Sequence, residues 1–188
     1  MKVNTGSAKG KRLKAVPGKT TRPITDLAKQ AVFNILMDEV RSSRWLDLFG
    51  GTGAVGIEAL SRGATSCTFL DIENAAVRVI EANLKATGLT AAAKVIRQDA
   101  LRYVGGRPNS QYDFIYVAPP QHQGVWQRAV AAIDDNVGWL ADGGTVIVQI
   151  DPNEYVALEL KHLELDDQRS YGRTMFCFYS AAPELTEE

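Results

Sequence analysis

The segment Trp45–Gly56, W-L-D-L-F-G-G-T-G-A-V-G, constrains the fold of this chain more than any other feature. It begins with a short apolar run typical of a buried strand, and four glycines follow within seven residues. Glycine permits a tight turn and lets a helix start close to the preceding strand. The segment therefore predicts a strand, a glycine turn and a helix, with room for a ligand at the turn.

Strand-like and helix-like segments alternate along most of the chain. We expect strands at 44–48, 66–70, 94–97, 112–117 and 145–150, and helices at 26–40, 54–62, 74–88 and 125–137. Thr25 and Asn74 are the expected N-caps of two of these helices. Alternation of this kind predicts an α/β, doubly wound parallel sheet. The tail, 161–180, has two further strands with a turn at Tyr171-Gly172, which is typical of an antiparallel hairpin.

The charge is unevenly distributed along the 188 residues. Residues 1–25 carry seven basic side chains and no acidic one, so the rest of the chain has a balance of −8 within the net charge of −1. We divide the chain into a basic extension (1–22), one domain (23–180) and an acidic tail (181–188). A basic arm on an acidic body favours a polyanionic partner, with nucleic acid foremost. A solvated, poorly ordered terminus is the alternative.

Several classes of protein are disfavoured by composition. No apolar run approaches the roughly 18 residues of a membrane helix, and Met1–Arg12 lacks the apolar centre of a secretory signal. Cys67 and Cys177 lie in apolar segments and are expected to be reduced core residues, and no metal site is expected. We expect a cytoplasmic monomer, or a protein of the plastid stroma if a transit peptide has been removed.

Two classes of nucleotide-like ligand fit the glycine turn. Gly51–Gly56 matches G-x-G-x-x-G, and Asp71 follows about twenty residues later, as in dinucleotide sites. Asp47 distinguishes the two classes, because a carboxylate beside the turn would repel a pyrophosphate by roughly 4 kcal/mol at 4 Å. The same carboxylate would attract the cationic amino acid end of S-adenosylmethionine. The sequence therefore favours S-adenosylmethionine, with S-adenosylhomocysteine as product, over a nicotinamide cofactor.

The cofactor residues follow from the rule that ligands bind beyond the carboxyl ends of parallel strands. Asp71 is expected to hold the ribose hydroxyls, Ile72 to cover the adenine and Asp99 to accept from the adenine amino group. For both acids, a helix N-cap or a loop role is the alternative. The complete expected set is Asp47, Phe49, Gly50, Gly51, Gly53, Asp71, Ile72, Asp99 and Ala100.

Five motifs make the chain similar to the RsmD family, the guanine-N2 methyltransferases of small-subunit (16S) ribosomal RNA. They are G-K-R-L at 10–13, T-R-P-I-T-D at 21–26, A-V-F-N-I-L at 31–36, D-L-F-G-G-T-G-A-V-G-I-E-A-L-S-R-G-A at 47–64 and Y-G-R-T-M-F-C-F-Y at 171–179. The resemblance implies a Rossmann-like class I methyltransferase fold, with seven strands and an antiparallel last strand. It also implies ribosomal RNA, or a small-subunit assembly intermediate, as the partner.

The chain departs from the family pattern at the catalytic loop. The usual D-P-P-Y or D-P-P-F is here Ala118-Pro119-Pro120-Gln121, a form that resembles a cyanobacterial and plastid branch, and Leu27 and Gln30 replace a usual arginine and glutamate. The backbone carbonyls of Ala118 and Pro119 can still accept from the target amine, and the prolines fix the loop. Gln121 replaces the ring that would stack on an extruded base.

The substitutions leave alternatives open. Tyr116, His122 or Trp126 could supply the missing ring, although a surface role for His122 and a core role for Trp126 are the plainer interpretations. A non-catalytic protein that binds S-adenosylmethionine and ribosomal RNA during assembly is a second hypothesis, and a methylase of DNA adenine or protein amides is a third. The expected phosphate contacts are Lys11, Arg12, Lys14, Lys19 and Arg22.

Overall fold

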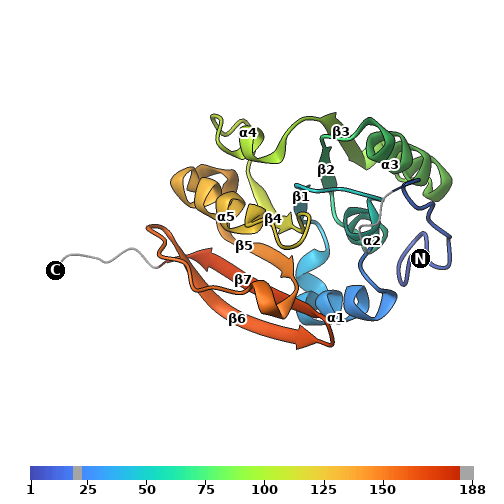
Figure 1. Ribbon diagram of the computed structural model, residues 1–188. Helices are drawn as coiled ribbons and strands as arrows, with labels where there is room; N and C mark the ends of the chain where they lie inside the picture. Colours follow the sequence, from blue (N-terminus) through green and yellow to red (C-terminus); the bar gives the residue numbers. More distant parts are fainter. Residues whose placement is uncertain (19–22, 183–188) are drawn as a thin grey trace.

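A computed structural model describes residues 1–18 and 23–182 of the chain. Seven strands form one sheet in the order β3-β2-β1-β4-β5-β7-β6 (Figure 1). Their bounds are β1 Arg44–Asp47, β2 Ser66–Asp71, β3 Ala93–Arg97, β4 Tyr112–Val117, β5 Leu140–Ile150, β6 Leu163–Tyr171 and β7 Thr174–Ala181. The first five strands are parallel, and β7 runs antiparallel to both β5 and β6. The expected α/β fold with an antiparallel last strand is confirmed.

Two helical layers cover this sheet (Figure 1). The helices are α1 Asp26–Leu36, α2 Ala54–Ser61, α3 Asn74–Thr87, α4 Ala100–Val104 and α5 Val125–Asp135. Apolar side chains of α1, α2 and α3 pack with Trp45 and Phe69 on one face. Those of α4 and α5 pack with Leu46 and Ile115 on the other face. Neighbouring strand residues point to opposite faces, so Trp45 and Leu46 enter different cores.

Several element boundaries differ from the expectation. The first helix ends at Leu36, because Met37 adopts φ 47°, and a short 3-10 turn continues to Val40. Glu73, not Asn74, occupies the N-cap position of α3, and its side chain makes no capping bond. The helix α4 was not expected, and β5 begins at Leu140 rather than at residue 145. Thr25 does cap α1, since its hydroxyl accepts from the Ala28 N–H at 3.1 Å.

The first 18 residues, which we call the N-terminal arm, pack against the body beside α2 and α3 (Figure 1). Val3, Ala8 and Leu13 are buried in the same core cluster as α1 and α2. The arm folds back on itself through an antiparallel bridge between Lys2 and Arg12. Lys19 to Arg22 and the tail from residue 183 lie outside the described residues.

Other composition-based expectations can be compared with the structure. Cys67 and Cys177 are both buried free thiols, as expected. None of the helices in the described ranges is long and apolar enough to cross a membrane. Within those ranges, no three His, Cys, Asp or Glu side chains are grouped so that they could bind a metal ion.

Candidate active site

The glycine turn lies at the carboxyl edge of the sheet, held between two neighbouring strands. The Leu48 N–H donates to the Tyr116 carbonyl on β4 at 3.0 Å, and the Gly50 N–H donates to the Leu70 carbonyl on β2 at 2.7 Å. Gly53 is the N-cap of α2 and has φ 79°, in the left-handed region that favours glycine. The turn is thus anchored on both sides and delivers α2 with its N-terminus facing the site.

Asp47, the last residue of β1, is buried beneath this turn with 2% of its surface exposed. Its Oδ1 atom has no hydrogen-bond partner among the described residues. Burial, together with the nearby charge of Asp71, raises the pKa of the Asp47 carboxyl to about 7. A buried carboxylate without a cationic partner is unfavourable, so this position suits a ligand that brings a positive group.

Asp71, the last residue of β2, joins the turn to the next helix. Its Oδ2 accepts from the Gly51 N–H and its Oδ1 accepts from the Glu73 N–H, both at 2.9 Å. Each carboxylate oxygen can accept more than one hydrogen bond, so the expected ribose contact is compatible with this geometry. The alternative role of a loop support is directly observed here, and the ribose contact stays a prediction.

The residues expected around an adenine follow β2 and β3. Ile72 is 56% exposed, which is unusual for a large apolar side chain and fits a surface that covers an aromatic ligand. Asp99 is the N-cap of α4, where its Oδ1 accepts from the Arg102 N–H at 2.8 Å. The N-cap role is the alternative given above for Asp99. The expected contact with the adenine amino group would use its second carboxylate oxygen. Ala100 is buried directly after it, and Phe49 is half-buried at the turn.

Together these residues fit S-adenosylmethionine. Asp47 offers an unpaired carboxylate oxygen for its cationic end, and Ile72 offers an apolar surface for its base. A Cβ atom on Gly50 would lie 2.7 Å from Ile80 Cδ1 and 3.1 Å from the Leu70 carbonyl oxygen, so the turn cannot take a side chain there. The cofactor contacts of Gly50, Gly51 and Gly53 stay predictions.

The loop Ala118-Pro119-Pro120-Gln121 leaves the end of β4, the strand beside β1. Ala118 is half-buried, Pro119 is buried, and Pro120 and Gln121 are exposed. The parallel pairing of Asp47 with Tyr116 places this loop and the glycine turn at the same edge of the sheet. The catalytic assignments to these four residues stay predictions.

Glu154 holds the far end of this loop, a contact that the sequence did not indicate. Its carboxylate accepts from the backbone N–H of His122, and its Oε2 also accepts from the Asp151 N–H at 3.4 Å. His122 adopts φ 60°, a conformation that costs energy for a residue with a side chain. Glu154 follows β5, so it fastens the loop after β4 to the neighbouring strand end.

The three aromatic candidates occupy different environments. Trp126 is 1% exposed and belongs to the core with α5, which agrees with its plainer interpretation. Tyr116 is buried, and its hydroxyl donates to Gln149 Oε1. Burial raises the pKa of Tyr116 well above its usual value, and the Asp47 charge adds to this. His122 is exposed beside the loop, so it is the ring best placed to meet a substrate.

The basic side chains expected to contact phosphates are only partly described. Lys11, Arg12 and Lys14 are exposed on the arm, and Lys19 and Arg22 lie outside the described residues. Lys14 is linked to the glycine turn, because Asn83 bonds both to its backbone and to the Thr52 carbonyl. These contacts with RNA stay predictions.

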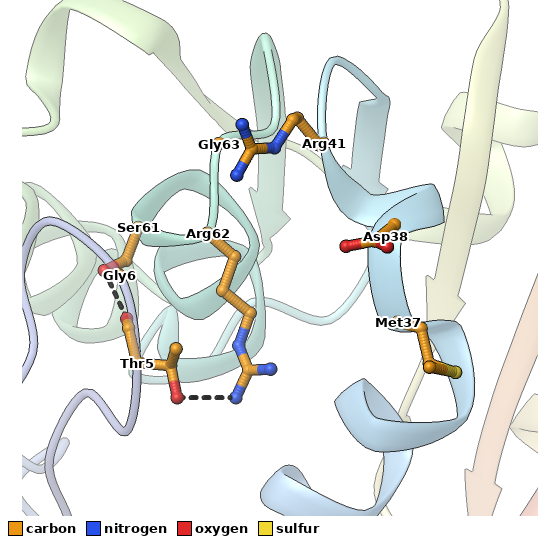
Figure 2. Close-up of a pocket in the computed structure, with 8 residues that line it drawn as sticks. All are labelled: Thr5, Gly6, Met37, Asp38, Arg41, Ser61, Arg62 and Gly63. Carbon is orange, nitrogen blue, oxygen red and sulfur yellow. Dashed lines mark hydrogen bonds between the residues drawn. The ribbon is translucent and has the colours of Figure 1, made fainter.

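A separate open pocket of about 610 Å³ lies where the arm meets α2 and the segment after α1. Arg41 and Arg62 line it together with Asp38, as Figure 2 shows. The Arg62 guanidinium is already committed to Glu58 at 2.9 Å and to the Thr5 hydroxyl at 3.2 Å. None of the residues that line this pocket belongs to the glycine turn.

A family model described as Conserved hypothetical protein 95 matches residues 1–180. The chain belongs to this family. YlbH of Bacillus subtilis is 35% identical over 95% of this chain and 98% of its own length. The Ribosomal RNA small subunit methyltransferase D of Escherichia coli K12 is 26% identical over 95% of this chain and 89% of its own. The resemblance to the RsmD family is confirmed.

The fold of this RsmD-family chain also matches solved structures. An Escherichia coli protein, yhhF, described as a methyltransferase, superposes with a TM-score of 0.84 and 26% identity. The match covers 96% of this chain and 97% of the other. The link between the A-P-P-Q loop and a cyanobacterial and plastid branch of the family stays a prediction.

Proposed function

We propose that this RsmD-family protein methylates the exocyclic N2 of a guanine in small-subunit (16S) ribosomal RNA, with S-adenosylmethionine as donor. The observation that carries the proposal is the buried, unpartnered Oδ1 of Asp47 at a glycine turn. The names of the relatives support the same reaction class. A cytoplasmic location follows from this substrate.

The donor supplies an electrophilic methyl group on a sulfonium. With the donor bound, the guanine amine nitrogen would form the new N–C bond as the S–C bond breaks, and the nitrogen would then release a proton to solvent water. The lone pair of this amine is delocalised into the ring, so the protein must orient it. We assign that task to the carbonyls of Ala118 and Pro119, which accept from the amine N–H groups and are held by the rigid prolines.

The substrate side has two components in this proposal. Gln121, the last residue of the loop, and His122, which follows it, are exposed and would contact an extruded base by its flat face or its edge. Lys11, Arg12 and Lys14 are exposed on the arm and would hold phosphates. Affinity for RNA falls as salt rises, so the slope of log affinity against log salt is negative. Replacing one lysine or arginine that contacts a phosphate with alanine should make this slope shallower by about 1.

Ala118 is a specific reason for a second candidate function. A carboxylate at this position would stabilise the positive charge that develops on nitrogen, and loss of one such group costs roughly 10²–10³ in rate. The chain would then be a slow enzyme or, as the second candidate, a non-catalytic assembly protein that binds the cofactor and ribosomal RNA.

Two measurements test the proposal. Calorimetry with S-adenosylhomocysteine should show binding that Asp47→Asn weakens by about 1–3 kcal/mol. Asp113→Asn is a matched control, because Asp113 pairs with Arg44 at the surface near the other end of β4. Labelled S-adenosylmethionine should then transfer its methyl group to small-subunit assembly intermediates. Binding without turnover would establish the second candidate, and absence of cofactor binding would overturn both.

A further inference from the structure

The side chain of Asn83, on α3, bonds simultaneously to the N-terminal arm and to the glycine turn. Its Oδ1 accepts from the Lys14 N–H at 2.8 Å, and its Nδ2 donates to the Lys14 carbonyl at 3.1 Å. The same Nδ2 donates to the Thr52 carbonyl at 2.8 Å. Both N–H donors and the oxygen of this fully buried carboxamide are thus used. A displacement of Lys14 therefore disturbs a bond that fixes the turn.

A second group of bonds fastens the arm to α2, the helix that the glycine turn begins. The Glu58 carboxylate accepts from the N–H groups of Asn4 and Thr5 at 2.8 Å and 3.0 Å. The Ser61 hydroxyl accepts from the Ala8 N–H at 2.9 Å and donates to the Thr5 carbonyl at 2.6 Å. The arm is therefore linked to the glycine turn at Thr52 through Asn83, and it contacts the helix leaving that turn directly.

A buried ion pair adds to this attachment. Lys29 Nζ lies 3.2 Å from Glu58 Oε2, and both side chains are 0% exposed. The same ammonium group donates to the Lys2 carbonyl at 2.6 Å. The arm thus supplies backbone groups to both members of a pair that has no access to water, so its docked position is strongly specified.

We propose that docking of the arm and binding of the cofactor are thermodynamically coupled through Asn83. A ligand that orders the turn at Gly51 to Gly53 also fixes Thr52, and through Asn83 it favours the docked position of Lys14. By linkage, the docked arm raises the affinity for the ligand by the same factor. This inference rests on the proposed function, because it requires the turn to bind a cofactor, and it adds a positioning role for Asn83.

Limited trypsin digestion tests the coupling without any RNA. Lys9, Lys11 and Arg12 are exposed cleavage sites on the arm, and mass spectrometry follows cleavage at each. Saturating S-adenosylhomocysteine should slow this cleavage at least about fivefold in the wild type, the lower end of typical coupling factors. In Asn83→Ala the protection should fall below about twofold. The affinity of this variant for S-adenosylhomocysteine should fall by the coupling factor that is lost. Asn34→Ala, at an exposed site on α1, should behave as the wild type.

A second pair of variants covers the case in which Asn83→Ala fails to fold. Lys14→Pro removes the N–H that Asn83 accepts, whereas Lys14→Ala keeps it and removes only the charge. Protection by S-adenosylhomocysteine should be lost in the first and kept in the second. Equal protection in Asn83→Ala, in Lys14→Pro and in the wild type would overturn the coupling. The coupling would also be overturned if S-adenosylhomocysteine bound to the wild type without protecting the arm from trypsin. That result would leave the proposed function intact. Absence of binding would overturn the proposed function and this inference together.

Discussion

Asp71 Oδ2 accepts a hydrogen bond from the Gly51 N–H at 2.9 Å, so the acid at the end of β2 supports the turn that follows β1. Its other oxygen supports the start of α3 through Glu73. A single side chain thus supports both the glycine turn and the segment that leads into α3, which border the proposed cofactor site.

Asp71→Asn separates support of the turn from contact with the ligand. The amide can accept at only one atom, so one of the two backbone bonds is lost, at about 1–3 kcal/mol of unfolding free energy. We expect a lower melting temperature together with an affinity for S-adenosylhomocysteine reduced about tenfold, the value of a lost charge-assisted bond. Thermal unfolding and calorimetry measure the two effects. An unchanged affinity in a destabilised variant would restrict Asp71 to support of the turn.

Asp47 predicts a pH dependence whose sign is fixed by its raised pKa of about 7. An aspartate in the unfolded chain titrates near about 3.9. Between these two pH values the Asp47 carboxyl is protonated in the folded protein but ionised in the unfolded chain. The unfolding free energy of the protein without ligand should therefore fall as pH rises from about 4 to about 7. A cationic ligand needs the ionised carboxylate, so affinity for S-adenosylhomocysteine should rise about tenfold from pH 6 to pH 8.

Calorimetry at pH 6, 7 and 8 measures this effect, with Asp47→Asn as the variant that removes the titrating group. The variant should bind more weakly at pH 8 and show a flat profile. A wild-type affinity that does not change over this range would mean that Asp47 does not face the cationic end of the ligand.

Ala118→Asp restores the carboxylate that the family pattern has at the head of the loop. Methyl transfer should increase, by up to roughly 10²–10³, or stay unchanged if the backbone carbonyls already suffice. Ala118→Asn, of nearly the same size but uncharged, is the matched control. Rates are measured with labelled S-adenosylmethionine on small-subunit assembly intermediates. If Ala118→Asp abolishes activity and the protein stays folded, the loop works by a different mechanism.

Glu154→Ala should loosen the loop that Glu154 fastens at His122. We expect the single-turnover rate of methyl transfer to fall by about 10²-fold, since small displacements of positioning groups cost that much. The affinity for S-adenosylhomocysteine should not change, because Glu154 follows β5, whereas the expected cofactor residues follow β1, β2 and β3. Glu154→Gln keeps one acceptor and should recover part of the rate. Glu159→Ala, an exposed neighbour, is the control, and an equal loss there would refute a specific role for Glu154.

The sequence predicted the parallel part of the fold well because each unit carries its own local signal. The apolar run 112–117 matches β4, and Gly88 ends α3 in the left-handed conformation expected of a helix stop. The segment 140–144 was not predicted as strand, because Ala141 to Gly144 have neither alternation nor strand preference. The strand starts early because Leu140 pairs with Tyr112 of β4, and the register then shifts before Thr145 pairs with Phe114.

The contacts of the arm could not be predicted from local pattern. Val3, Ala8 and Leu13 are spaced five residues apart, which matches neither a helix nor a strand. The hydrogen bonds that hold the arm in place are also distant in the chain. Those to Glu58, Ser61 and Asn83 join residues that are 53 to 69 positions apart. A glutamate on a helix normally indicates a solvated face, and nothing in the sequence marks Glu58 as an acceptor for backbone amides.

The buried pair of Lys29 and Glu58 has a consequence for any attempt to re-engineer the RNA preference of this protein. Exchanging the first 18 residues for a basic segment that does not dock in the same way would deprive a water-free ion pair of its backbone partners, and each lost hydrogen bond to a charged group costs about 1–3 kcal/mol. That is a large fraction of the stability of a typical domain. Chimeras made in this way would fail to accumulate before any altered specificity could be seen, so the N-terminal arm is not an interchangeable module.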